Sequence, residues 1–192
     1  MINLELYPIL LDNRKSLRET SKDTSDPNDI QYMTSSEMEV VNFDLVKRHY
    51  ANGFELSEEV VTSVDAIVPF ENGILFVEFK NGKVNNREIK DKARDSLLIF
   101  LEIIGEDLAF SRGNIDFVVV YNLEKNPLPR QVQKGQLQET PSRVSIANHF
   151  MEKAKKEFIC FDLERYERIY YRNIHTYSKE RFEEYLQTLR LG

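Results

Sequence analysis

The sequence predicts an α/β domain with a central mixed β-sheet flanked by helices. Two observations favour this class. Three short apolar segments rich in β-branched and aromatic residues, at 60–70, 74–80 and 115–121, have the composition of buried strands. Between the second and the third, apolar residues recur with the period of an amphipathic helix. Strands and helices that alternate in this way are typical of one layered α/β unit.

Length and composition indicate one ordinary globular domain. The chain has 192 residues, of which 41% are hydrophobic, and a chain of this size can bury a self-sufficient core. No apolar run approaches the ~18 residues needed to cross a bilayer, so no membrane partner is expected. The N-terminal residues lack the pattern of a secretory leader. The single cysteine excludes an internal disulfide framework, and a cytoplasmic location is therefore expected.

The first half of the chain contains the clearest local signals. Residues 37–50 are predicted to be helical at least from Asp44, while 38–43 are equally compatible with a short preceding strand. The strands at 60–70 and 74–80 flank Glu71-Asn72-Gly73, which predicts a hairpin, because Asn-Gly readily adopts the positive φ angles of tight turns.

A helix is expected to follow this hairpin. It should begin at Asn85 or Asn86, both good N-cap residues, and end at Gly105. The nearly all-apolar segment 115–121 then predicts a strand buried on both faces. Polar loops are expected at 18–36 and 124–141, helices near 142–156 and 178–189, and strands near 158–162 and 168–176.

The charge balance argues against a surface built for phosphate binding throughout. The chain has 26 basic and 32 acidic residues, for a net charge of −6. Two segments are nevertheless locally basic: 83–94, with five basic and two acidic residues, and 125–156, with seven and two. Either segment could line a groove for nucleic acid, and a solvated surface explains them equally well.

The strongest chemical signal is an acid and a lysine at the end of the second hairpin strand. Glu78 and Lys80 are two residues apart, so in a strand they point to the same face. Asp65 lies on the partner strand. Two carboxylates that converge in an apolar sheet are suited to Mg²⁺ or Mn²⁺, and a neighbouring lysine can orient or deprotonate an attacking water. The alternative is a salt bridge on an exposed edge strand, which would contribute little.

This pattern resembles the PD-(D/E)XK nuclease superfamily, whose fold is called restriction-endonuclease-like. The matching features are VDAI, the turn, ILFVEFKNG and the amphipathic helix after it. The resemblance implies an αβββαβ core at about 37–121 within a single domain 1–192, with 122–192 as a C-terminal elaboration. It implies that Asp65, Glu78 and Lys80 are catalytic, and that Asp65 and Glu78 bind the metal.

Members of this superfamily often add a glutamate from the first helix. Glu37, Glu39 and Asp44 are the candidates here. Glu39 is favoured as the third metal ligand because it would share a helix face with Phe43 and Val46. Lys83 and, on the helix after the motif, Lys90 and Lys92 are expected to contact nucleic-acid phosphates.

The resemblance implies a Mg²⁺- or Mn²⁺-dependent nuclease that hydrolyses phosphodiester bonds of DNA, in preference to RNA, in phage or mobile-element biology. It leaves a homodimer open. The alternative from a different class is a non-catalytic module that keeps the fold for binding or assembly. A third hypothesis, an acidic mimic of nucleic acid, would make the negative surface itself functional.

Overall fold

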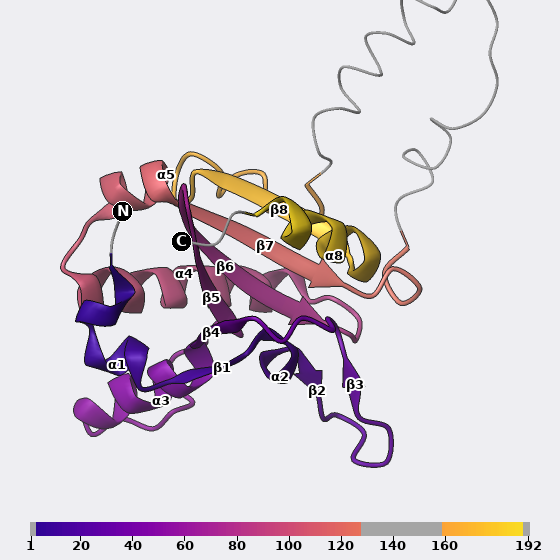
Figure 1. The fold of residues 1–192 in the computed structure, drawn as a ribbon, viewed down its shortest axis with the longest axis horizontal. Helices are drawn as coiled ribbons and strands as arrows, with labels where there is room; N and C mark the ends of the chain where they lie inside the picture. The colour runs from indigo at the N-terminus through magenta and orange to yellow at the C-terminus, as the bar shows by residue number, and fades with distance from the viewer. Residues whose placement is uncertain (1–2, 128–158, 190–192) are drawn as a thin grey trace, which may run out of the picture.

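A computed structural model describes residues 3–127 and 159–189 and shows an α/β fold built on a six-stranded mixed sheet (Figure 1). The strand order across the sheet is β1-β4-β5-β6-β7-β8, and β2 and β3 form a separate two-stranded hairpin. The sheet strands are β1 Arg14–Ser16, β4 Glu39–Asn42, β5 Ala66–Phe70, β6 Gly73–Lys80, β7 Ile115–Tyr121 and β8 Asn173–Ser178. The hairpin strands are β2 Lys22–Asp23 and β3 Gln31–Tyr32.

The helices cover both faces of the sheet. A short 3₁₀ turn, Leu4–Leu6, precedes α1; the α-helices are α1 Pro8–Leu11, α2 Leu17–Thr20, α3 Phe43–Gly53, α4 Asn86–Ile104, α5 Leu108–Asn114 and α8 Lys179–Thr188. Buried residues of α3 and α4 pack on one face, and those of α2 and α8 pack on the other. Among the described residues, no helix combines the length and apolar content that crossing a membrane requires.

Strand directions confirm the expected mixed sheet. Strands β1, β4, β5 and β6 pair antiparallel, whereas β6, β7 and β8 pair parallel. Helix α4 connects β6 to β7, as parallel neighbours require. Between 39 and 121 the major elements run strand, helix, strand, strand, helix, strand. This order differs from αβββαβ in that α3 follows the first strand instead of preceding it.

The open question at 38–43 is resolved as a strand followed by a cap. Residues 39–42 form β4, and the side chain of Asn42 accepts a hydrogen bond from the backbone N–H of Leu45 at the start of α3. The expectation that Glu39 lies on a helix face is therefore wrong. Asn42 begins the helix because its side-chain oxygen satisfies one of the free N–H groups of the first turn.

The predicted strand at 60–70 is shorter than expected and begins at Ala66. Its first residues have suitable β-branched side chains, but their backbone groups bond elsewhere. The N–H of Thr62 donates to Asp95 (2.9 Å) and that of Val64 to the hydroxyl of Ser96 (2.8 Å), both on α4. Tertiary hydrogen bonds thus replace the ladder that strand propensity favours.

Helix α4 and strand β7 match their predicted positions. Asn85 caps α4, and Gly105 ends it in the left-handed conformation with φ of 71°. All seven residues of β7 are buried. Near the C-terminus, α8 is confirmed, and the strand expected at 168–176 is present as β8, shifted to Asn173–Ser178.

Other predictions near the C-terminus are wrong or untested. Residues 159–162 form no strand, since Phe161 and Asp162 both adopt positive φ angles, 66° and 56°. The loop predicted at 18–36 contains α2 and the β2–β3 hairpin. The helix expected near 142–156, most of the loop at 124–141 and nearly all of the basic segment 125–156 lie outside the described residues.

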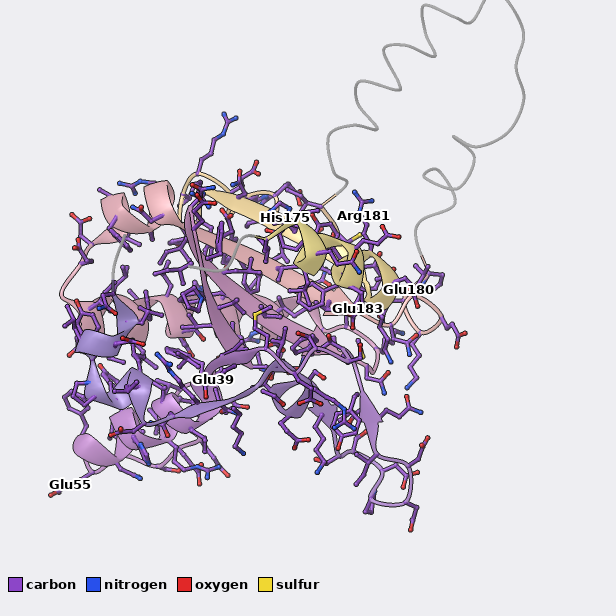
Figure 2. The ribbon with its side chains drawn as sticks, viewed as in Figure 1. Glu39, Glu55, His175, Glu180, Arg181 and Glu183 are labelled. Atoms are coloured by element: carbon purple, nitrogen blue, oxygen red, sulfur yellow. The ribbon has the colours of Figure 1, made fainter. Side chains whose placement is uncertain are left out.

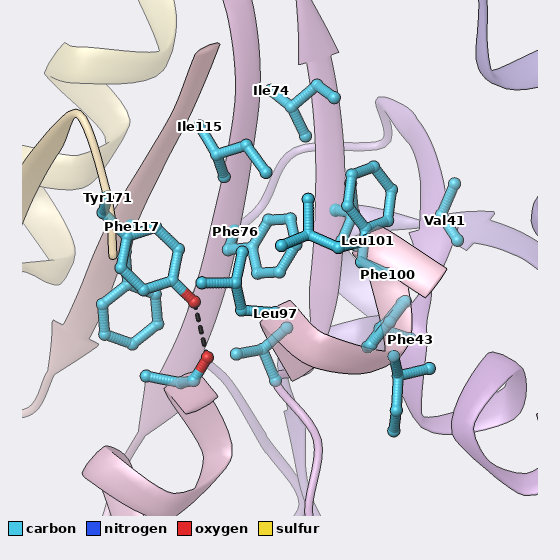
Figure 3. Close-up of a cluster of buried hydrophobic side chains, with 14 of the residues drawn as sticks. Val41, Phe43, Ile74, Phe76, Leu97, Phe100, Leu101, Ile115, Phe117 and Tyr171 are labelled. Carbon is cyan, nitrogen blue, oxygen red and sulfur yellow. Dashed lines mark hydrogen bonds between the residues drawn. The ribbon is translucent and has the colours of Figure 1, made fainter. Parts of the chain in front are cut away.

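An aromatic cluster anchors α4 to the sheet (Figure 3). The ring of Phe76 on β6 lies 5.2 Å from that of Phe100 and 5.9 Å from that of Tyr171. The buried hydroxyl of Tyr171 donates to the carbonyl of Ala93 on α4 (2.6 Å), so its polar end is satisfied. This packing fixes where α4 lies relative to the end of β6.

The hairpin turn requires glycine because of a close approach. Phe70 pairs with Gly73, so the loop has two residues, and Gly73 has φ of 157°. A Cβ at this position would collide with the backbone carbonyl oxygen of Asn114. Arg172 completes the corner: it donates to the carbonyl of Asn72 (2.7 Å) and forms a two-pronged pair with Asp116.

We expect Gly73→Ala to lower the free energy of unfolding by about 1–3 kcal/mol, because the new methyl group meets rigid backbone at a strained φ. Urea denaturation measures the change. Gly82→Ala is the matched control, since nothing lies within 4 Å of its Cβ position. Equal losses in the two variants would contradict the assignment of strain to Gly73.

Candidate active site

Asp65 lies at the end of the hairpin, close to Glu78. The ladder of β5 and β6 ends at the pair Ala66–Val77, and Asp65 is the residue directly before this pair. The N–H of Asp65 donates to the carbonyl of Val77 (3.1 Å). Beyond this point the backbone of β6 bonds to a side chain: the N–H of Phe79 donates a hydrogen bond to the carboxylate of Asp65 (2.6 Å). Lys92 on α4 lies within 4 Å of both carboxylates, so both point toward this helix.

Glu78 is fully buried, with an exposed fraction of 0%. Strand β6 lies between β5 and β7, so it is an interior strand of the sheet. The alternative predicted an ion pair of Lys80 on an exposed edge strand: the pair of Lys80 with Glu78 is present at 3.3 Å, but the edge location is wrong. A buried carboxylate is costly unless it is paired or bound to a cation.

Two lysines meet this carboxylate from different elements. Lys80, two residues along β6, lies 3.3 Å from Glu78 Oε1 and also donates a hydrogen bond to Glu88 on α4. Lys92, also on α4, lies 2.8 Å from Glu78 Oε1, donates to Oε2 at 3.0 Å, and lies 3.8 Å from Asp65 Oδ1. The ammonium group of Lys92 thus bridges the two carboxylates.

Burial dominates the electrostatics of this group. It raises the pKa of Asp65 well above its usual value, reinforced by the negative charge of Glu78 and opposed by Lys92. It also raises the pKa of Glu78, although Lys92 and Lys80 oppose that shift. For Lys92, burial lowers the pKa, but the two carboxylates outweigh it and raise the pKa overall. Raised carboxyl pKa values beside a positively charged lysine are typical of functional sites.

The third acid near this group is Asp44, in the first turn of α3. It is a charge close enough to raise the pKa of Asp65, and it accepts a 2.5 Å hydrogen bond from the hydroxyl of Ser63. Glu39, the favoured candidate, instead pairs with Arg14 (3.1 Å) and is exposed (Figure 2). Glu37 pairs with Arg18 at 3.6 Å. The structure brings Asp44, and neither glutamate, toward Asp65.

The lysines expected to contact nucleic acid occupy three different environments. Lys83 is exposed in the loop between β6 and α4. Lys90 is partly buried, with its Nζ 3.6 Å from a carboxylate oxygen of Asp162. Lys92 points into the carboxylate group, where only 17% of its side chain is exposed. Only Lys83 and Lys90 therefore remain at an accessible surface.

The carboxylate pair has donors suited to a hard divalent cation. Among the described residues, no group of three or more His, Cys, Asp or Glu side chains is placed to hold a metal ion. Asp65 and Glu78 alone could do so, because Mg²⁺ commonly uses one or two carboxylates and keeps several waters. Within the same part of the chain, Glu78 Oε1 is a buried oxygen that accepts no well-directed hydrogen bond. The ammonium groups of Lys92 (2.8 Å) and Lys80 (3.3 Å) already lie against this oxygen, so a metal ion would have to compete with them.

Lys92 is the site residue whose role sequence reasoning missed, although a signal was present. It lies three residues after Ile89 and four before Ser96, and both of these are fully buried. Positions at this spacing share a helix face, so Lys92 belongs to the side of α4 that faces the sheet. A lysine on that side needs a buried partner, and Glu78 supplies it.

No protein-family model, curated protein or solved structure matches the chain. The interpretation of this site consequently depends on its geometry and chemistry.

Proposed function

We propose that the protein is a metal-dependent nuclease that hydrolyses phosphodiester bonds of DNA. The observation that carries this proposal is the position of Glu78, a fully buried carboxylate that shares Lys92 with Asp65 and has Lys80 beside it. Natural proteins seldom bury such a charged group at the centre of a sheet without using it. The site lies where β6 ends and α4 begins, and ligands of α/β proteins commonly bind at the carboxyl ends of parallel strands.

A restriction-endonuclease-like core is part of the same proposal. Its support is the antiparallel run β4, β5, β6, followed by α4 and the parallel strand β7, with the acid and the E-x-K sequence on the two hairpin strands. The element order differs from αβββαβ at one point, because α3 follows β4 and does not precede it.

Asp65 and Glu78 would hold Mg²⁺ or Mn²⁺. When bound, such an ion supplies a Lewis acid for a phosphoryl oxygen and lowers the pKa of a coordinated water. The ammonium of Lys80, 3.3 Å from Glu78 Oε1, is placed to orient the attacking water and to offset charge that develops on the phosphate. Glu88 holds that ammonium from the other side and so limits its movement.

Cleavage of DNA tests this proposal. We expect the purified protein to nick plasmid or degrade single-stranded DNA in Mg²⁺ or Mn²⁺, and to lose this activity in excess chelator. The control is the double variant Asp65→Asn, Glu78→Gln, which keeps the shape of both side chains. Cleavage that survives in the double variant would place the activity elsewhere or in a contaminant.

DNA binding is expected to involve the surface beside the start of α4. We predict that Lys83→Glu with Lys90→Glu weakens DNA binding and lowers the slope of log affinity against log salt by up to about 2, because each phosphate contact contributes about 0.9. Lys15→Glu with Arg48→Glu changes the net charge equally at other exposed positions. If both double variants bind alike, this surface is not the interface.

The ion pair of Lys92 favours a second candidate, a non-catalytic module for binding or assembly. Its ammonium already supplies positive charge between the two carboxylates, 2.8 Å from Glu78 and 3.8 Å from Asp65. A protein of this kind would bind DNA or a partner without cleaving it. The cleavage assay above separates the two candidates, because only the nuclease responds to chelator.

A further inference from the structure

Lys92 lies between the same two carboxylates that a divalent ion would bind. Its Nζ is 2.8 Å from Glu78 Oε1, 3.0 Å from Oε2 and 3.8 Å from Asp65 Oδ1. We propose that this ammonium is the resident cation of the carboxylate pair and that a divalent ion binds only by displacing it. The inference rests on the proposed function, because it concerns the same site, but its outcome is measured by binding.

Lys92 and a divalent ion would compete for the same oxygen atoms of Glu78. Glu78 Oε1 accepts no well-directed hydrogen bond among the described residues, yet it is the atom nearest to Lys92. The hydrogen bond of Lys92 goes to Oε2 of the same carboxylate. Both oxygens are thus engaged by one positive charge, and a divalent ion within contact distance of that charge would be repelled strongly in a poorly hydrated site.

The partners of the two lysines show which one must leave. Lys80 donates its hydrogen bond to Glu88, outside the carboxylate pair, so it keeps a partner when Glu78 binds another cation. Lys92 donates to Glu78 itself. Its side chain is 17% exposed and has a flexible four-carbon stem, so it can turn toward solvent without moving α4. Exchange of one cation for another is therefore a local movement of Lys92.

The same arrangement gives Lys92 a structural role before a metal binds. The carboxylates of Asp65 and Glu78 both contact the ammonium of Lys92, and Asp44 adds a third nearby negative charge. Removing the ammonium leaves these charges to repel one another. We therefore expect a variant without it to be less stable in chelator and to gain more stability from metal than the wild type.

The experiment compares Mn²⁺ affinity and thermal stability in Lys92→Met, Lys92→Arg and the wild-type protein. Titration calorimetry and the electron paramagnetic resonance signal of free Mn²⁺ give the dissociation constant. We expect Lys92→Met to bind Mn²⁺ at least about tenfold more tightly, and Lys92→Arg, which keeps the charge, to remain near the wild type. Arg94→Met on the same helix removes one charge outside the site and should leave the affinity unchanged.

Equal Mn²⁺ affinity in Lys92→Met and wild type, or no binding in either, overturns the inference. Tighter binding by Arg94→Met as well would also overturn it, because the effect would then reflect net charge. If Lys92→Met does not fold, Lys92→Gln is measured against the same criterion. Tighter binding in the Lys92 variant together with a wild type that never cleaves DNA supports the inference and refutes the nuclease. DNA cleavage by the wild type together with an unchanged Mn²⁺ affinity in the Lys92 variant supports the nuclease and refutes the inference.

Discussion

Lys80→Ala is expected to lower the rate of DNA cleavage by roughly 10²-fold or more, the usual scale for a positioned acid–base or charge-stabilising group. The ammonium of Lys80 lies beside Glu78 and is held by Glu88, so its loss removes a charge next to the proposed water while the two carboxylates stay in place. Mn²⁺ affinity should not fall, because both carboxylates remain and one neighbouring positive charge is removed. Nicking of plasmid DNA at saturating metal measures the rate.

Arginine at this position should not restore the rate, since guanidinium cannot release its proton near neutral pH and is larger than the ammonium that it replaces. Lys15→Ala, an exposed lysine on β1, is the control for general loss of positive charge. A Lys80→Ala protein that cleaves as fast as the wild type would remove Lys80 from the mechanism and leave the fold untouched.

The central hairpin was the most predictable part of the molecule because local rules determine it. Alternation along a strand predicts that Glu78 and Lys80 share a face, and the Asn-Gly pair predicts the position of the turn. The proximity of Asp65 to Glu78 depends on the register of the two strands and on the bend of the chain at Asp65, which the sequence does not specify. The structure shows that Lys92 contacts both carboxylates.

The third acid and the second lysine could not be assigned in the same way. Glu39 was favoured on the expectation of helix, but pairing with β1 and β5 makes that segment a strand, and tertiary pairing is not visible in local periodicity. Lys92 is expected from the sequence to contact nucleic-acid phosphates, which requires an accessible side chain. Its burial depends on the position of α4 over β6, which the cluster around Phe76 determines.

The start of β5 is a similar case. Val60, Val61 and Val64 have the propensity of a strand, but the backbone N–H groups of Thr62 and Val64 bond to side chains of α4. Asp95 and Ser96 lie more than thirty residues further along the chain, so no local window contains both partners. Asp65, the residue before β5, also contacts α4, through Lys92 at 3.8 Å.

Glu78→Gln is expected to abolish metal-dependent cleavage while leaving the free energy of unfolding within about 1 kcal/mol of the wild type, or above it. Burial raises the pKa of Glu78 even with both lysines present, so the charged form is less favourable in the folded than in the unfolded protein. The neutral amide has nearly the same shape. A buried ion pair that served only structure would behave differently, because removing one partner commonly costs about 3–5 kcal/mol.

The difference in the free energy of unfolding between Glu78→Gln and the wild type should depend on pH. A carboxyl group whose pKa is higher in the folded than in the unfolded state contributes stability at low pH, and that contribution is lost as the pH rises through the folded pKa. Glutamine has no such loss, so the variant should gain stability relative to the wild type as the pH rises from about 5 to about 8. Urea denaturation across this range measures the difference, with Glu58→Gln, an exposed partner of Arg48, as the control. A variant that is destabilised more at pH 8 than at pH 5 would show that Glu78 stabilises the fold as a charged group, and the case for a site kept for function at the expense of stability would fail.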